Sequence, residues 1–192
     1  QIGNLIQQLR EKGHLENTVI IFLSDNGYFL GNHGLGNKLT MHEESVRVPM
    51  FIYWDKLKNK GGRSNSLVSS IDILPTILEW AGVPIPEYLQ GKSLNPILSN
   101  LHATIQDYVV SESVGVGGKT GTGHRMVRTK DFKYILSDVN DQAFFDLRND
   151  PFEQSNIIDD DTFRKETVTL RNYLQKWKNF VGDRKPLSSG YE

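Results

Sequence analysis

A short, apolar segment that ends in a polar turn most strongly constrains the fold of this chain. Residues 18–24 are largely β-branched or apolar, and Asp25, Asn26 and Gly27 follow directly. Continuous apolarity is typical of a strand covered on both sides, as in a parallel sheet. Residues 1–12 carry apolar side chains at helical spacing and predict a helix before this strand. Helix, strand and turn together predict an α/β unit, in which ligands bind beyond the carboxyl ends of the strands.

The segments that follow continue this α/β pattern. Residues 27–44 form a long, glycine-rich loop, and long loops of this kind in compact domains are usually functional or disordered. Residues 48–54 predict a second strand. Asp72 is placed to cap a helix and Gly82 to end it. Residues 84–103 carry three prolines and predict a loop.

From residue 104 the pattern changes to that of a small antiparallel sheet. Four short strands are predicted, at residues 108–111, 125–129, 132–136 and 142–147. Aromatic and apolar residues at helical spacing predict a terminal helix over residues 162–181, and we interpret its stripe as core packing. We therefore expect an α/β fold in which residues 1–103 form the back end of an α/β domain. Residues 104–192 are expected to form a small subdomain of four antiparallel strands and the terminal helix.

Composition argues against several classes of function. The chain has 22 Lys and Arg residues against 23 Asp and Glu residues, which gives a formal net charge of −1. Such a balance, without a basic tract, argues against nucleic acid or an acidic membrane surface as a partner. No apolar run approaches the ~20 residues that a membrane-spanning helix needs. The absence of cysteine excludes disulfides, thiolate metal sites and a cysteine nucleophile within the chain.

The first candidate site is the pair Asp25–Asn26 at the end of the predicted strand. Carboxylate and amide oxygens are hard ligands, which suit Ca²⁺ or Mg²⁺ better than Zn²⁺. The alternative is an ordinary strand-to-loop turn, because Asp, Asn and Gly each favour turns. Two ligands do not fill the coordination shell of about six to eight oxygens around Ca²⁺. Most of such a site would therefore come from elsewhere.

The second candidate site lies in the glycine-rich loop and consists of Lys38 and His33. Lys38 offers a compact positive charge with three donors, which suits a tetrahedral oxyanion. His33 can donate a proton to the same ester or to its leaving group, because its charge responds to pH near neutrality. The alternative is a solvated loop with a surface lysine, and the run is not a Walker motif. Residues 145–156 are acidic as well, but we interpret them as a capped turn.

Six separated blocks, taken in order, resemble the C-terminal half of the formylglycine-dependent sulfatases of the alkaline-phosphatase-like superfamily. The blocks cover most of residues 17–158. They are Val19–Gly27, Leu30–Leu35 with Lys38, Glu43–Pro49, Ile71–Gly82, Arg125–Thr129 with Lys133–Ile135, and Asp146–Asn156. Each block is weak evidence alone, but their number and order make the resemblance specific.

This resemblance implies roles for individual residues. Asp25 and Asn26 match the second pair of Ca²⁺ ligands in the family, for which Mg²⁺ is the alternative metal. Lys38 matches the lysine that contacts the sulfate ester. His33 lies where many members place a residue near the substrate. His124 is a candidate sugar contact, because loops at that place reach the pocket in relatives.

The resemblance also implies an activity, that of a sulfuric ester hydrolase acting on sulfated carbohydrate. The formylglycine of such enzymes is made from a Cys/Ser-x-Pro-x-Arg motif, which this sequence lacks. We therefore expect the chain to be the C-terminal portion of a longer enzyme, inactive alone and completed by the N-terminal half of its own domain. Relatives work mostly in the periplasm, outside the cell or in lysosomes, so a periplasmic or secreted location is expected.

Two other functions remain open from the sequence. A phosphate or phosphonate ester hydrolase of the same superfamily would also use Lys38, because sulfate and phosphate are both tetrahedral. A non-catalytic glycan-binding module is the other alternative. Such a module, however, has no need for Asp25 and Asn26 at a strand end together with Lys38.

Overall fold

The computed structural model divides into two compact units. The described residues are 1–38, 40–59, 61–113 and 123–183. The first unit comprises Gln1–Asp25 and Val48–Ile105, and the second comprises Asn26–Arg47 and Gln106–Glu192. The expected domains, residues 1–103 and 104–192, stay a prediction. The segment Asn26–Arg47, however, groups with the C-terminal residues and not with the α/β part.

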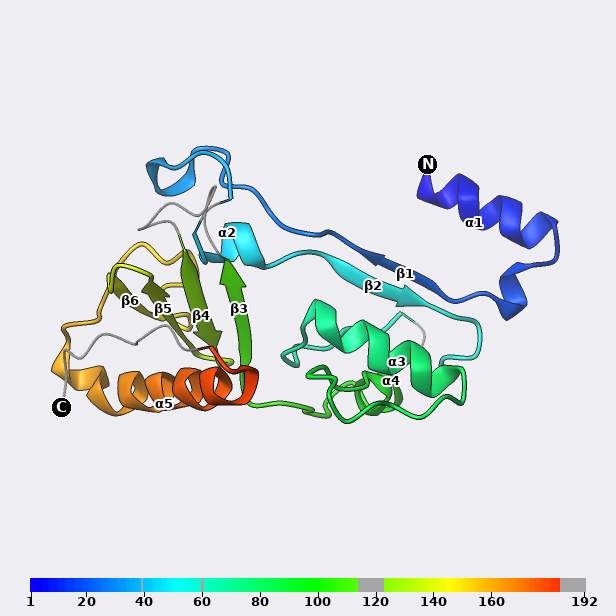
Figure 1. Ribbon diagram of the computed structural model, residues 1–192. Helices are drawn as coiled ribbons and strands as arrows, with labels where there is room; N and C mark the ends of the chain where they lie inside the picture. Colours follow the sequence, from blue (N-terminus) through cyan, green and yellow to red (C-terminus); the bar gives the residue numbers. More distant parts are fainter. Residues whose placement is uncertain (39, 60, 114–122, 184–192) are drawn as a thin grey trace. The chain divides into compact units, whose positions relative to one another are not determined.

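The first unit contains most of the elements predicted before residue 103. Its helices and strands are α1 (Ile2–Glu11), β1 (Ile20–Leu23), β2 (Met50–Tyr53), α3 (Ile73–Trp80) and α4 (Asn95–Ser99), with 3₁₀ turns at Leu15–Asn17 and Ser70–Asp72 (Figure 1). The predicted first helix, both strands and the helix after Asp72 are confirmed. The helix α4 falls in a stretch predicted as loop. Its Pro96 lies in the first turn, where no backbone hydrogen bond is lost.

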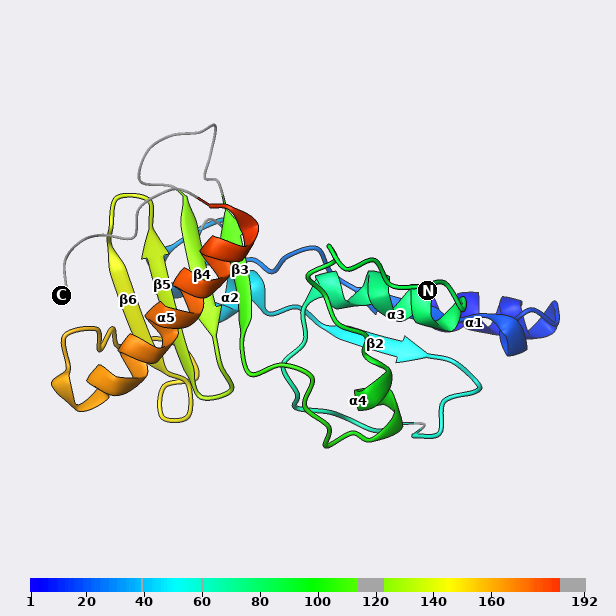
Figure 2. The ribbon, with the colours of Figure 1, turned by 60° about the horizontal axis from the view of Figure 1, so that its bottom comes forward.

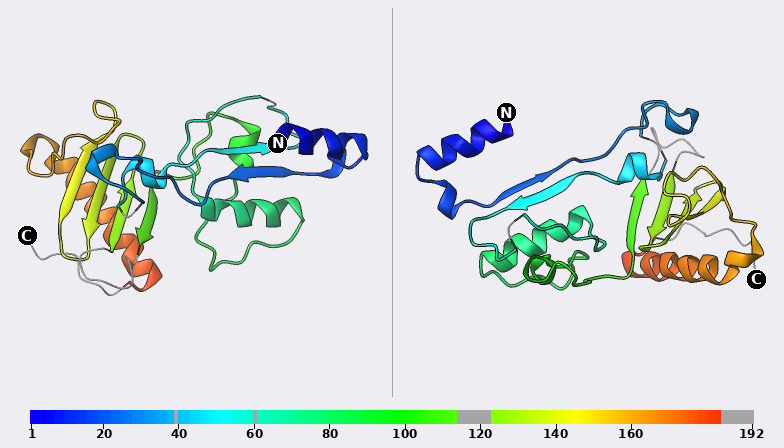
Figure 3. Two further views of the ribbon diagram at one scale, coloured as in Figure 1. Left: turned by 90° about the horizontal axis from the view of Figure 1, so that it is seen from above. Right: turned by 180° about the vertical axis from the view of Figure 1, so that it is seen from behind.

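The strands β1 and β2 lie side by side and pair antiparallel, with Ile20 opposite Tyr53 (Figure 3). The parallel pairing suggested by the apolarity of residues 18–24 is therefore wrong for the partner that β1 has in the described part of the chain. Apolarity does not fix the direction of a strand's partner, and the cover expected on both sides is also missing, because no residue of β1 is buried in the described part of the chain. The rings of Phe22 and Phe51 stack across the two strands at 4.9 Å, and 36% and 42% of these residues stay exposed.

A buried aspartate, Asp72, joins distant segments of the first unit. Its carboxylate accepts hydrogen bonds from the backbone N–H groups of Ser69 at 2.7 Å and Lys92 at 2.8 Å. Thr76 donates its hydroxyl to the Asp72 carbonyl at 2.6 Å and accepts the N–H of Leu94 at 2.9 Å. Asp72 occupies the N-cap position of α3, as predicted, but its carboxylate makes no cap hydrogen bond to α3 and instead binds Ser69, in the turn before the helix, and Lys92.

The second unit is built on an antiparallel sheet of four strands in the order β3-β4-β5-β6. Its elements are α2 (Glu43–Val46), β3 (Val109–Ser113), β4 (His124–Arg128), β5 (Phe132–Ser137), β6 (Gln142–Asp146) and α5 (Arg164–Val181), with 3₁₀ turns at Asn32–Gly34 and Asp161–Phe163. The four predicted strands and the terminal helix are confirmed. The expected fold class, an α/β chain that ends in a small antiparallel sheet packed with a C-terminal helix, is therefore confirmed.

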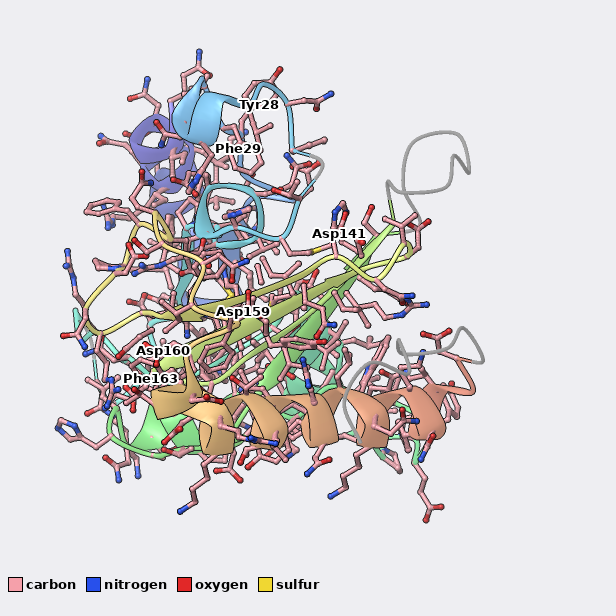
Figure 4. The ribbon with its side chains drawn as sticks, turned by 90° about the vertical axis from the view of Figure 1, so that its left-hand side faces the viewer. Tyr28, Phe29, Asp141, Asp159, Asp160 and Phe163 are labelled. Atoms are coloured by element: carbon pink, nitrogen blue, oxygen red, sulfur yellow. The ribbon has the colours of Figure 1, made fainter. Side chains whose placement is uncertain are left out.

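One face of this sheet packs against α5, which runs across the strands (Figure 2). The buried residues of this core are Val127, Tyr134, Leu136, Phe144, Leu170 and Leu174. Phe163, at the N-terminal end of α5, packs its ring edge-on against Phe132 at 6.0 Å (Figure 4). The apolar stripe of the terminal helix is core packing, as predicted.

The opposite face of the sheet is covered by the segment that contains α2. Met126 and Ile135 from the sheet form a second buried cluster with Met41 and Phe145, and Val46 of α2 packs against it. The two faces of one sheet are thus covered by segments that lie far apart in the sequence. This arrangement explains why Asn26–Arg47 belongs to the second unit.

Replacing Leu174 with alanine is expected to lower the free energy of unfolding by about 2–5 kcal/mol, because a fully buried side chain leaves a cavity. Chemical denaturation followed by circular dichroism measures the change. Val168 lies on the same helix with 46% of its surface exposed, so Val168→Ala is the matched control. It is expected to change the free energy by no more than about 0.5 kcal/mol. Equal effects of the two substitutions would contradict this assignment of the core.

Candidate functional site

The predicted pair Asp25–Asn26 lies just after β1. Asp25 is exposed and accepts a hydrogen bond from the Ser24 hydroxyl at 3.4 Å. Asn26 is half-buried, and its Nδ2 donates to the Gly27 carbonyl at 2.7 Å. Its Oδ1 accepts a hydrogen bond from the Lys38 ammonium. The structure thus brings the predicted metal ligand Asn26 and the predicted anion contact Lys38 into direct contact.

Gly27 holds this turn against α2. Its N–H donates to the Ser45 carbonyl at 2.8 Å, and a Cβ at this position would lie 1.9 Å from the Glu44 carbonyl oxygen. Close approach of two backbones, and not a positive φ, therefore requires glycine here. Ser45 also donates its hydroxyl to the Lys38 carbonyl at 2.9 Å. The short helix α2 thus fixes the backbone beside both partners of the Asn26–Lys38 contact.

His33, the other predicted residue of the loop, belongs to a neighbouring cluster. Its Nε2 lies 3.3 Å from Oε1 of Glu44, and its ring lies 4.5 Å from that of His42. Phe29, labelled in Figure 4, is buried and lies in the loop after β1. Its ring meets both histidine rings nearly edge-on. We call His33, His42 and Glu44 the histidine cluster. In the described residues, the contacts of His33 are with this cluster and Phe29, while Asn26 and Lys38 contact each other.

The environment of two members of the cluster, His42 and Glu44, shifts their pKa values. Burial, followed by the charges of His33 and Lys133, lowers the pKa of His42 to about 4. His42 is therefore uncharged near neutral pH, and its Nδ1 lies 2.7 Å from the Thr40 hydroxyl. Burial raises the pKa of Glu44, but hydrogen bonds from its own backbone N–H, Asn32 and His33 outweigh burial and leave that pKa below its usual value. The sequence analysis did not single out His42 or Glu44, because neither carries a spacing signal of its own.

His124, the predicted sugar contact, is the first residue of β4. It lies opposite Ser113 of β3 and Ser137 of β5. Because side chains alternate along a strand, His124 shares the face of Met126, which is the face that α2 covers. Electrostatic interaction with His124 is the smallest of the causes that act on the His42 pKa, so the two histidines lie close enough to interact.

The donors present fit a divalent cation only in part. Asp25 and Asn26 offer two hard oxygens, and the ammonium at Asn26 Oδ1 indicates that this oxygen is presented to a cation. Among the residues that the structure describes, no group of three or more His, Asp or Glu side chains is arranged to hold a metal ion. A complete shell would therefore need ligands beyond those described here.

The acidic segment after β6 is a capped turn, as predicted. The Asp150 carboxylate accepts the N–H groups of Gln154 at 3.0 Å and Ser155 at 2.9 Å. Hydrogen bonding to Arg148 lowers the pKa of Asp146 to about 2. These carboxylates are engaged in local structure, so the interpretation of this segment as a metal site is excluded.

Comparison with known proteins identifies the family. A family model described as N-sulphoglucosamine sulphohydrolase, C-terminal, matches residues 31–179. The chain belongs to this family. The matched range spans the loop with Lys38, the helix α2, the whole sheet and most of α5. The predicted resemblance to the C-terminal part of the sulfatases is thereby confirmed.

Individual relatives of this sulphohydrolase-family chain are sulfatases. An N-acetylglucosamine-6-O-sulfatase of Bacteroides thetaiotaomicron is 33% identical, over 96% of this chain and 34% of its own length. An arylsulfatase of Clostridium perfringens is 35% identical, over 92% of this chain and 37% of its own length. A solved structure of a protein in complex with its substrate D-glucosamine-2-N,6-O-disulfate is 32% identical with a TM-score of 0.88, over 98% of this chain and 39% of that chain. The chain thus spans well under half the length of the relatives it matches.

In the described ranges, no helix combines the length and the apolar character needed to cross a membrane.

The stability of the second unit is expected to fall as the pH is lowered from about 6.5 to about 4. His42 has a pKa of about 4 when folded, against an ordinary value of 6.5, so the unfolded chain binds more protons in this window. This share of the stability is fully present above pH 6.5 and is lost as the pH approaches 4. Thermal unfolding midpoints at pH 7, 5.5 and 4 measure the slope.

Two substitutions test the assignment of this slope to His42. His42→Gln is expected to make the pH dependence shallower, because the titrating group is gone. His102 is exposed, so His102→Gln is the matched control and should retain the slope of the parent protein. An unchanged slope in His42→Gln would disprove the assignment.

Proposed function

We propose that the protein containing this chain is a sulfatase that hydrolyses sulfate esters of carbohydrates. The observation that carries the proposal is the contact between Lys38 and Asn26 in a chain that belongs to a sulphohydrolase family. A turn with a surface lysine would not require the two side chains to meet. A site for an anionic ester and a cation brings such side chains close together, because both ligands must bind within one short distance.

Lys38 is the residue of this chain that we assign to the sulfate group. Its ammonium would neutralise charge on the sulfate oxygens as the ester bond breaks. Asp25 and Asn26 would hold Ca²⁺, or Mg²⁺, which supplies Lewis-acid polarisation of the ester when bound. His33, held by Glu44, would donate a proton toward the leaving group, and His124 would contact the sugar.

The remaining catalytic groups would come from the rest of the protein. The formylglycine nucleophile belongs to a motif that these 192 residues do not contain, so we expect the isolated chain to be inactive. The N-terminal half of the catalytic domain is the partner that we propose for the first unit. Exposed apolar residues support this, including Phe22 and Phe51 of the β1–β2 pair and Leu74 and Ile77 of α3.

We propose a sulfated amino sugar, free or within a glycan, as the substrate. The printed names of two relatives, an N-acetylglucosamine-6-O-sulfatase and a protein bound to D-glucosamine-2-N,6-O-disulfate, support this class. We also propose a periplasmic or secreted location, where sulfated glycans are met. We propose no nucleic-acid partner, because the formal net charge of the chain is −1.

Replacing Lys38 with alanine in the full-length protein is expected to lower kcat/KM for N-acetylglucosamine-6-O-sulfate by about 100-fold or more, because the sulfate loses a fixed positive charge. Release of sulfate measures the rate. Lys58 is likewise an exposed lysine, so Lys58→Ala is the matched control with an expected rate near that of the parent. Retention of full activity in Lys38→Ala would rule out the assigned role.

Removing the metal with a chelator is expected to abolish turnover by the full-length protein, and added Ca²⁺ is expected to restore it. Asp25→Ala should abolish turnover at ordinary Ca²⁺ concentrations, because a charged ligand is lost. Asp159→Ala, at an exposed carboxylate of the second unit, is the control that should behave as the parent.

The same assays separate the proposed function from its alternatives. A protein that binds sulfated glycan, with or without Asp25, but never releases sulfate is a non-catalytic binding module. Faster hydrolysis of a phosphate or phosphonate ester than of the sulfate ester would assign the protein to the other hydrolases of the superfamily.

A further inference from the structure

A fully buried lysine lies under α2. Lys133, on β5, has no exposed surface. Its ammonium lies 2.7 Å from Oε1 of Glu43 and 2.7 Å from Oε1 of Glu153, and it donates to the Met41 carbonyl at 3.1 Å. The ammonium is thus surrounded by one carbonyl oxygen and two carboxylate oxygens. Arg128, directly opposite on β4, also reaches Glu43, with Nε 3.0 Å from Oε1.

These four charged side chains form a balanced set, which we call the Lys133 network: Lys133, Arg128, Glu43 and Glu153. Glu153 is as deeply buried as Lys133, and its Oε2 accepts the backbone N–H of Glu43 at 2.6 Å. Burial raises the pKa of Glu153, and the neighbouring Lys133 acts in the opposite direction. Loss of Lys133 alone would take away the cation that contacts this buried carboxylate, which is strongly unfavourable.

What the Lys133 network holds is the beginning of α2. The atoms held are the carbonyl of Met41 and both the N–H and the carboxylate of Glu43. A helix of four residues is far too short to persist alone. The position of α2 on the sheet therefore depends on this network together with the apolar packing of Met41 and Val46.

The helix α2 transmits this position to the candidate site. Ser45 accepts the Gly27 N–H at 2.8 Å and donates its hydroxyl to the Lys38 carbonyl at 2.9 Å. The backbone at Gly27 lies so close to Glu44 that no side chain fits between them. A shift of α2 would therefore move the two ends of the loop, and with them the side chains of Asn26 and Lys38.

We propose that Lys133 is a positioning residue for the candidate site. Through Glu43 and Glu153 it holds α2 at the place that sets the Asn26 amide oxygen for a cation and the Lys38 ammonium for a sulfate ester. The inference rests on the proposed function and adds to it a residue that touches neither ligand.

The double variant Lys133→Met/Glu153→Gln in the full-length protein tests the proposal. It removes one cation and one carboxylate together, so charge balance is kept and the fold is expected to persist. The kcat/KM for N-acetylglucosamine-6-O-sulfate is expected to fall by about tenfold to hundredfold, because small misplacements of a site cost rates of this order. The dissociation constant for Ca²⁺, measured by titration calorimetry, is expected to rise, since Asn26 is displaced too. Thermal unfolding checks that the variant is folded.

A second buried lysine gives the matched control. Lys178, on α5, is 2% exposed and lies 3.6 Å from Asp183, on the opposite face of the same sheet. Lys178→Met removes a buried ammonium without touching α2, so kcat/KM and Ca²⁺ affinity should stay at the parent values even where stability falls. Equal losses in the two variants would show a general effect of burial and overturn the proposal.

The single variant Glu43→Gln is a second, independent test of the proposal. It leaves the Lys133–Glu153 pair intact and weakens the hold on α2, so a smaller change of the same sign is expected. Parent-like kcat/KM and Ca²⁺ affinity in a folded Glu43→Gln or double variant overturn the proposal. A parent protein that binds Ca²⁺ but does not release sulfate contradicts the proposed function instead, and the calorimetric comparison then still decides whether Lys133 positions Asn26.

Discussion

An ammonium group buried between two carboxylates is the interaction on which the position of α2 in the second unit depends. Apolar side chains of similar volume could fill the space around Lys133 at no loss of stability, because burying charge is costly. The charged side chains make directional contacts, which apolar side chains do not. Hydrophobic packing is non-directional, whereas the contacts of Lys133 and Glu153 select particular backbone atoms of Met41 and Glu43. They therefore specify one position of α2 on the sheet.

The two faces of the sheet are held in correspondingly different ways. α5 has 18 residues and buries an apolar stripe that includes Leu170 and Leu174 against the strands. α2 has four residues and can bury little area, so its apolar anchors Met41 and Val46 are supplemented by ion pairs. The antiparallel register makes this possible, because it places Lys133 directly opposite Arg128 on the face that α2 covers.

The local sequence pattern predicts most of the helices and strands but few of the long-range contacts. Periodicity predicted the strands and α5. The polar turn after β1 pointed to Asn26 and the glycine-rich loop pointed to Lys38, and the structure brings these two side chains into contact. The predicted pairing direction of β1 was wrong, because the apolarity of a strand does not indicate the direction of its neighbour. The Lys133 network escaped notice because Glu43 meets Arg128 across 85 positions and Glu153 across 110. A spacing of that size leaves no local signature in the sequence.

The candidate site depends on α2, a short helix that needs contacts with the sheet to keep its position. The side chains that meet there, Asn26 and Lys38, come from the two ends of a loop, and α2 ties the two ends together through Ser45. A shift of α2 would move both side chains at once. A shift of α5 would be resisted by its long apolar contact with the sheet. Directional contacts are therefore needed where the element is short. For α2 these contacts are made by Lys133, Glu43 and Glu153.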